Sequence, residues 1–135
     1  MTPSTDRFTL DLPPDPAFVA TARMFASSLA RHFEIEEDVV ADLKLAISEA
    51  CKRALAAKDE GRGLTMSVAR DNGRLIFEVS QGDLPRLEDE QDTPTPSDHQ
   101  MAAGLSLELI TALFEDAVIA DDTEGKPVVR FSVSG

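Results

Sequence analysis

Strict alternation of polar and apolar side chains predicts a strand near the start of the chain. Residues 7–12 read RFTLDL, and a period of two is typical of a strand with one buried face. Prolines at positions 13, 14 and 16 end the pattern, since proline has no amide hydrogen to donate within a sheet. Asp15 followed by Pro16 is a typical helix start, with the aspartate as cap and the proline in the first turn.

Apolar residues then recur at helical spacing over two stretches, residues 17–32 and residues 36–57. The predicted buried stripes are Phe18, Val19, Ala22, Phe25, Ala26 and Leu29 in the first helix and Val39, Val40, Leu43, Ala46, Ile47, Ala50 and Ala54 in the second. The only cysteine, Cys51, falls on the buried side of the second helix, where we expect it to be a small core residue.

Four further strands are predicted in the second half of the chain. Residues 64–70 and 74–79 flank Asp71-Asn72-Gly73, which is strong turn chemistry for an antiparallel hairpin. A third helix over residues 104–114 precedes strands at residues 117–120 and 128–133. The strands are grouped rather than alternating with helices. We therefore expect one α+β domain over residues 1–135, a two-layer sandwich in which helices cover one face of a mainly antiparallel sheet.

Residues 81–103 have a different composition. They contain three prolines and six carboxylates but a single basic residue, Arg86, and few of them suit a core. We interpret this stretch as a long, exposed and mobile acidic loop, and loops of this length within a compact domain are often functional.

The charge of the chain limits its partners. The 135 residues include 13 Lys and Arg against 25 Asp and Glu, a net charge of -12, which argues against nucleic acid or an anionic membrane and favours a basic protein partner. One cysteine excludes a disulfide framework and any cysteine-based zinc site, and His32 and His99 lack nearby acidic residues at metal spacing. No apolar run approaches the roughly 20 residues of a membrane span, so we expect a cytoplasmic protein.

Four segments together carry a resemblance to a known family. They are residues 18–23 (FVATAR), 42–54 (DLKLAISEACKRA), 77–83 (FEVSQGD) and 104–110 (GLSLELI). In this order they resemble the GHKL-type ATPase fold, in particular the RsbW-like anti-sigma-factor serine kinases of bacteria. The second segment is similar to the family's N-box, the third to its adenine box, and the fourth to its glycine-rich phosphate box. Residues 81–103 stand where the family has its ATP lid.

The chain departs from the family at the positions that the resemblance assigns to nucleotide. Arg53 stands where the family has the asparagine that ligates Mg²⁺, and a guanidinium has only donors to offer. Gln81 replaces the aspartate that reads adenine, next to Gly82, and Asp83 replaces a glycine. Gly104 of the phosphate box is retained, but Ser106 replaces its second glycine, which crowds a backbone that must approach phosphates. The resemblance implies Mg-ATP as cofactor, whereas these changes predict that ordinary Mg-ATP or ADP binding, and kinase activity with it, is weak or lost.

Glu49 aligns with the family's general base, which activates a serine hydroxyl of a partner protein. The alternative is structural, because Glu49 and Arg53 stand four residues apart with the acid first, the favoured order for a helical ion pair. The sequence leaves both open and favours a structural pair or a relic.

Arg23 aligns with an arginine that the family uses to grip both its sigma factor and the antagonist of the STAS type. The alternative is a solvated residue at the edge of the first helix. The resemblance implies sigma-factor sequestration, release by a STAS-type anti-anti-sigma factor, and a homodimer. We expect an anti-sigma factor without kinase activity; an active serine kinase that keeps Glu49 as base, or a binding module for another regulator, remain alternatives.

Overall fold

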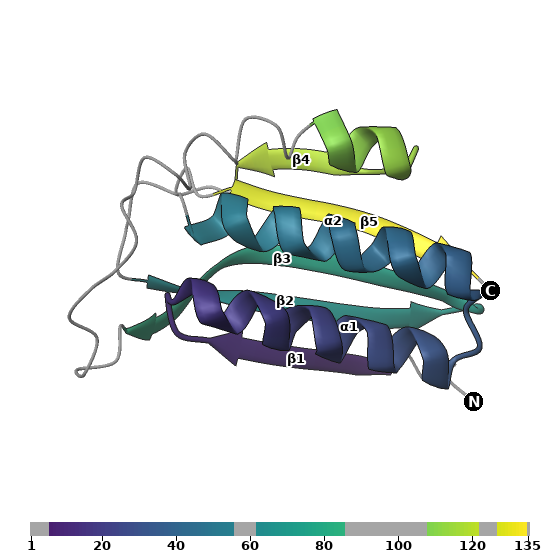
Figure 1. Ribbon diagram of the computed structural model, residues 1–135, viewed down its shortest axis with the longest axis horizontal. Helices are drawn as coiled ribbons and strands as arrows, with labels where there is room; N and C mark the ends of the chain where they lie inside the picture. Colours follow the sequence, from purple (N-terminus) through teal and green to yellow (C-terminus); the bar gives the residue numbers. More distant parts are fainter. Residues whose placement is uncertain (1–5, 56–61, 86–107, 122–126, 135) are drawn as a thin grey trace.

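The computed structural model describes residues 6–55, 62–85, 108–121 and 127–134. Two helices lie on one face of a five-stranded sheet (Figure 1). The elements along the chain are β1 (Arg7–Leu12), a 3-10 turn (Pro16–Phe18), α1 (Val19–His32), α2 (Glu37–Leu55), β2 (Arg62–Asp71), β3 (Arg74–Pro85), β4 (Val118–Asp121) and β5 (Pro127–Ser134). A further helical segment occupies residues 108–113. The predicted α+β sandwich is confirmed.

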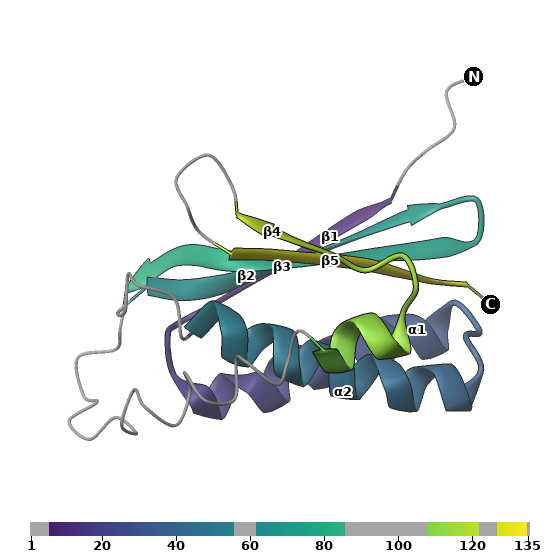
Figure 2. The same ribbon diagram turned by 90° about the horizontal axis from the view of Figure 1, so that it is seen from above.

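The sheet has the order β1-β2-β3-β5-β4, and every neighbouring pair is antiparallel. The helices and the segment at residues 108–113 lie on the same side of it, and no described element covers the other side (Figure 2). We call this uncovered side the open face. The N-terminal strand pairs with β2 and α1 packs on α2 within one chain, so neither needs a second copy to be buried.

The core lies between the helices and the sheet, where the predicted patterns place it. Alternate residues of each strand point to the helices, and the largest fully buried side chains include Phe77, Phe131, Leu43 and Ile47. Phe131 stacks between Phe77 and Phe114 at centroid distances of 5.7 and 4.7 Å. Each large apolar side chain that is buried contributes about 1.5–3 kcal/mol, so this aromatic stack helps to hold the segment that ends at Phe114 on β3 and β5.

The predicted hairpin is formed by β2 and β3. Asp71 pairs with Arg74, so the loop has two residues, Asn72 and Gly73, with φ of 50° and 81°. Positive φ at both central positions is what a type I′ turn requires, and Asn-Gly is its preferred sequence.

The described boundaries differ from the predicted ones in one place that concerns the site. Strand β3 continues to Pro85, so Gln81 and Gly82 belong to a strand, whereas the sequence placed them at the start of the acidic loop. The strand is longer because β2 pairs with it again at Arg62 and Pro85 beyond an irregularity between Arg62 and Leu64. The rest of the predicted lid, from residue 86 to residue 103, lies outside the described residues.

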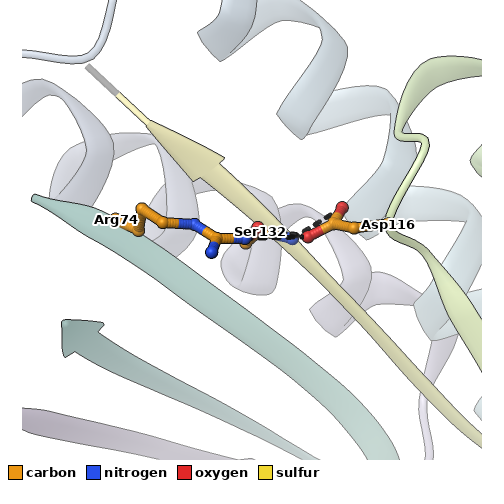
Figure 3. A network of polar contacts seen from close by, with 3 residues as sticks. All are labelled: Arg74, Asp116 and Ser132. Carbon is orange, nitrogen blue, oxygen red and sulfur yellow. Dashed lines mark hydrogen bonds and ion pairs between the residues drawn. The ribbon is translucent and has the colours of Figure 1, made fainter. Parts of the chain in front are cut away.

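A polar cluster ties the segment before β4 to the sheet (Figure 3). Arg74 Nη2 donates to Asp116 Oδ2 at 3.2 Å, and the backbone amide of Ser132 donates to Asp116 Oδ1 at 3.3 Å. The Ser132 hydroxyl also donates to Asp116 and accepts from Arg74. The cluster therefore links β3, β5 and the turn that leads from the segment at residues 108–113 into β4.

Candidate nucleotide pocket and docking surface

Glu49 lies in the second half of α2, with a side chain that is 15% exposed. Its carboxylate forms an ion pair with Lys52 Nζ at 3.4 Å. The sequence predicted Arg53 as the partner, one position further along the helix, and no ion pair between Glu49 and Arg53 occurs in the described part of the chain. Both spacings bring side chains together on a helix, and here the pair forms at three residues rather than four.

Arg53 has a partly buried side chain. Its Nε is fully buried and has no hydrogen-bond partner among the described residues. A buried donor without an acceptor costs about 1–3 kcal/mol, and an arginine offers five donors and no acceptor. The donor set at this position therefore does not fit a divalent metal, which requires oxygen ligands.

Gln81 and Gly82 lie near the end of β3. Gln81 is 9% exposed and faces Leu64 of β2 across the sheet. A side chain added at Gly82 would meet Thr65 Oγ1 at 2.6 Å and the Leu64 carbonyl carbon at 2.9 Å. The close approach of β2 thus requires glycine here whether or not a nucleotide binds, so Gly82 alone is no evidence for an adenine site.

The two phosphate-box positions, Gly104 and Ser106, lie outside the described residues. Their predicted contact with phosphates, like the predicted lid, therefore stays a prediction. The structure places the other predicted pocket residues on two elements that pack against each other, α2 and β3. Glu49 and Arg53 are one helical turn apart on α2, and Gln81 and Gly82 are neighbours on β3.

Arg23 lies on α1 and reaches across to α2. Its Nη1 donates to the Ser48 hydroxyl at 3.2 Å, and that hydroxyl donates to the Lys44 carbonyl at 3.0 Å. Arg23, Lys44, Leu45 and Ser48 line a shallow depression of about 370 Å³ between the two helices. Arg23 is therefore anchored to the second helix rather than free at the edge of the first.

Two large apolar side chains are exposed on the same two helices. Met24 of α1 is 67% exposed and Leu45 of α2 is 43% exposed. Helix α1 contains no acidic residue, although the whole chain carries 25. We call Arg23, Met24, Lys44, Leu45 and Ser48 the docking surface, because it combines exposed apolar area with two cations on an otherwise acidic protein.

Sequence reasoning identified Arg23 but missed Met24, Lys44 and Leu45. One signal was available: Leu45 is a large apolar residue off the buried stripe of its helix, where a polar residue is expected. The pairing of Arg23 with Ser48, 25 residues away, depends on how the helices pack.

The single thiol is part of the core. Cys51 is completely buried, and desolvation raises the pKa of its thiol to about 12. It therefore stays protonated and unreactive at neutral pH, since the thiolate is the nucleophile.

Comparison with known proteins gives the family. Residues 12–133 match the family described as Histidine kinase-like ATPase domain. The chain belongs to this family. Among its relatives are the serine-protein kinase RsbW of Listeria monocytogenes, 30% identical over 135 residues, and that of Bacillus velezensis, 28% identical over 134 residues. These matches cover 92% and 91% of this chain and 85% and 83% of the relatives.

Membership in the histidine kinase-like ATPase family confirms the resemblance carried by the four sequence segments. No helix in the described part of the chain is long and apolar enough to cross a membrane. Within those same residues, no group of three His, Cys, Asp or Glu side chains is placed to hold a metal ion.

Proposed function

We propose that this chain is a cytoplasmic anti-sigma factor that sequesters a sigma factor by protein–protein binding and has lost serine-kinase activity. The observation that carries the proposal is the docking surface, where Arg23, Lys44 and the exposed Leu45 line a depression and Met24, next to Arg23 in α1, is exposed. The proposal includes self-association as a homodimer and release by a STAS-type anti-anti-sigma factor, both of which the family resemblance implies.

The docking surface is suited to a partner that presents carboxylates beside apolar residues. An arginine pairs with carboxylates through a planar set of donors, and the Ser48 hydroxyl holds one end of the Arg23 guanidinium in place. Exposed Met and Leu side chains supply apolar area that becomes buried on contact. Short-range contact and long-range attraction then come from different parts of the molecule, since the net charge of -12 attracts the basic DNA-binding helices of a sigma factor.

Loss of kinase activity is supported by the residues at the family's metal position. The family implies Mg-ATP, and transfer of a phosphoryl group needs a metal that bridges the phosphates. Arg53 supplies donors only, and its Nε is buried without an acceptor among the described residues. Since these residues do not fit the metal, we assign no phosphoryl-transfer step to this chain. Glu49 is then a structural residue that pairs with Lys52.

Capture of partners from the native cell tests the proposal. The purified chain is used as bait, and retained proteins are identified by mass spectrometry. We expect a sigma factor among them, and we expect the purified sigma factor to bind the wild-type chain directly. Recovery of a different regulator without any sigma factor would favour the alternative of a general binding module.

A matched pair of variants locates the contact. Arg23→Ala removes the anchored guanidinium from the docking surface, whereas Arg31→Ala removes an exposed arginine of the same helix that pairs with Glu37 at 3.0 Å. We expect Arg23→Ala to weaken sigma-factor binding at least about tenfold, as for an arginine at the centre of an interface, and Arg31→Ala to leave it unchanged. Circular dichroism checks that both variants fold. Equal affinity for both variants would remove Arg23 from the interface.

A further inference from the structure

The open face of the sheet carries a balanced set of charges on an acidic chain. Among the described residues its charged side chains are all exposed, and they are Arg7, Arg74, Arg130, Asp11, Asp71 and Glu78. These arginines and carboxylates cancel, whereas the whole chain has a net charge of -12. The negative excess therefore lies elsewhere, and a ligand that carries a carboxylate meets no net repulsion on this face.

Two of these charged side chains are already held by neighbours. Asp11 accepts a hydrogen bond from the Thr65 hydroxyl at 2.6 Å. Arg74 forms an ion pair with Asp116 at 3.2 Å. The others form no ion pair and no side-chain hydrogen bond within the described residues, and they are Arg7, Asp71, Glu78 and Arg130. Their charges are therefore available to pair with those of a ligand.

The same four residues line a depression near the middle of the open face. It measures about 350 Å³, and its other lining residues are Ser67, Ala69 and Ile76. Small-molecule sites in proteins typically have volumes of about 300–1,000 Å³. The charges that the chain leaves without partners on this face are thus gathered around a space that a small molecule can fill.

Charges of opposite sign stand next to each other at this depression. Glu78 of β3 is directly opposite Arg130 of β5, and side chains in such a pair have Cβ atoms about 4.5–5.5 Å apart. A ligand with a single charge is attracted by one of these two side chains and repelled by the other. A ligand that carries an ammonium group next to a carboxylate pairs with both, since the carboxylate of Glu78 accepts from the ammonium and the guanidinium of Arg130 donates to the carboxylate.

Apolar surface lies beside this charged pair. Ile76 precedes Glu78 by two positions on β3, so both side chains point to the open face. Ala69 of β2 is directly opposite Ile76, and both residues are partly buried. An aliphatic group that covers them removes apolar area from water. The depression therefore combines a place for two opposite charges with a place for an aliphatic chain.

We propose that this depression binds a free α-amino acid with an aliphatic side chain. The ammonium group lies against Glu78, the carboxylate against Arg130, and the side chain on Ile76. Pairs between exposed charges are weak, so we expect a dissociation constant in the millimolar range. The helices that carry the docking surface lie on the other side of the sheet (Figure 2), and the inference goes beyond the proposed function and does not depend on it.

Ligands that differ by one charged group test the proposal. Leucine carries both charges, isocaproate has the same carbon skeleton without the ammonium group, and isoamylamine lacks the carboxylate. Each is titrated into the isotopically labelled full chain at constant pH and ionic strength, and the backbone amide resonances are followed by NMR. We expect leucine to shift the resonances of Ser67, Ile76, Glu78 and Arg130. We expect each compound with a single charge to bind at least about threefold more weakly, because it loses one of the two attractions.

Two variants assign each ligand charge to a side chain. Glu78→Gln removes the partner of the ammonium group, and Arg130→Gln removes the partner of the carboxylate. We expect each variant to bind leucine at least about threefold more weakly than the wild type. Glu78→Gln should not weaken the binding of isocaproate, and Arg130→Gln should not weaken that of isoamylamine. Both residues are exposed, so we expect both variants to fold, and the same spectra check this.

Matched controls remove one charge of each sign from the helix layer. Arg31→Gln and Asp42→Asn alter exposed residues of α1 and α2, and we expect both to bind leucine like the wild type. Three results would each overturn the inference: leucine leaves the named resonances unshifted well above millimolar concentration, isocaproate or isoamylamine binds as tightly as leucine, or the controls weaken binding as much as Glu78→Gln and Arg130→Gln do.

Discussion

At the scale of single residues, Arg53 places a permanent positive charge at the position where the sequence resemblance implies a metal ligand. Replacing it by asparagine restores an oxygen ligand there, because an amide oxygen can coordinate Mg²⁺ and a guanidinium cannot. We expect isothermal titration to show no measurable binding of Mg-ATP to the wild-type chain and greater, Mg²⁺-dependent binding to Arg53→Asn.

This prediction has two controls. The Lys52→Asn variant removes a cation one position earlier on α2. A titration in which EDTA replaces Mg²⁺ tests whether binding depends on the metal. Micromolar affinity of the wild-type chain for Mg-ATP would contradict the loss of kinase activity and favour the active serine kinase with Glu49 as base. No gain in Arg53→Asn would assign the loss to the other altered boxes.

Cys51 gives a prediction on stability against pH. Burial raises the pKa of its thiol from 9.0 to about 12 in the folded chain, so the folded state keeps the proton where the unfolded state loses it. The stabilisation is complete below pH 9 and is lost as the pH rises toward the folded pKa. At about pH 10.5 the loss amounts to roughly 2 kcal/mol, at about 1.4 kcal/mol per pH unit.

Urea denaturation of the wild type and of Cys51→Ala at pH 8 and at about pH 10.5 measures this loss. The variant has no thiol to ionise, so we expect the wild-type stability to approach or fall below that of the variant at the higher pH. A difference in unfolding free energy between the two proteins that does not change with pH would mean that the thiol is accessible in the folded chain.

At the scale of elements, the cluster of Arg74, Asp116 and Ser132 fixes the turn before β4. Asp116 accepts hydrogen bonds from both other residues (Figure 3), so Asp116→Ala removes the shared acceptor. We expect a loss of about 1–2 kcal/mol, moderate because the Arg74 and Asp116 side chains are 55% and 44% exposed and exposed pairs contribute little. Urea denaturation measures it. Glu115→Ala, at the adjacent exposed carboxylate, is the control, and an equal effect there would show that the cluster is not specific.

The periodic spacing of apolar residues predicted most helices and strands, because the side chains that each element buries recur at regular intervals along the chain. The helices α1 and α2 follow their apolar stripes, and the β2–β3 hairpin follows from Asn72-Gly73. The extension of β3 to Pro85 was missed because residues 81–85 have little strand propensity of their own, and pairing with β2 holds them in the sheet. Tertiary context decided there, as it commonly does for strands.

The candidate site was only partly predictable, for the same reason. The four boxes and Arg23 could be identified along the sequence, but the hydrogen bond from Arg23 to Ser48 depends on the packing of two helices. Lys52 and Arg53 are both close enough along α2 to pair with Glu49, and in the structure it is Lys52 that forms the ion pair. At Gly82 the sequence assigned a glycine to nucleotide binding, but the structure gives another reason for it. Strand β2 approaches so closely there that only glycine fits.

At the scale of the whole molecule, the proposed function assigns the net charge and the docking surface to different steps of sigma-factor binding. The charge of -12 acts over a Debye length of about 10 Å at 0.1 M salt and steers a basic partner before contact. In the proposed complex, Arg23 contributes only once the surfaces touch. For the sigma factor recovered by capture, we therefore expect the association rate constant to fall at least about tenfold between low salt and about 0.3 M salt.

Arg23→Ala is expected to raise the dissociation rate constant while leaving the association rate constant and its salt dependence almost unchanged, because the substitution alters net charge by one unit in twelve. Stopped-flow mixing of the sigma factor with the wild type, Arg23→Ala and Arg31→Ala separates the two rate constants. An association rate that is independent of salt would mean that the acidity of the chain plays no part in capture. An effect of Arg23→Ala confined to association would mean that this arginine steers the partner rather than holds it.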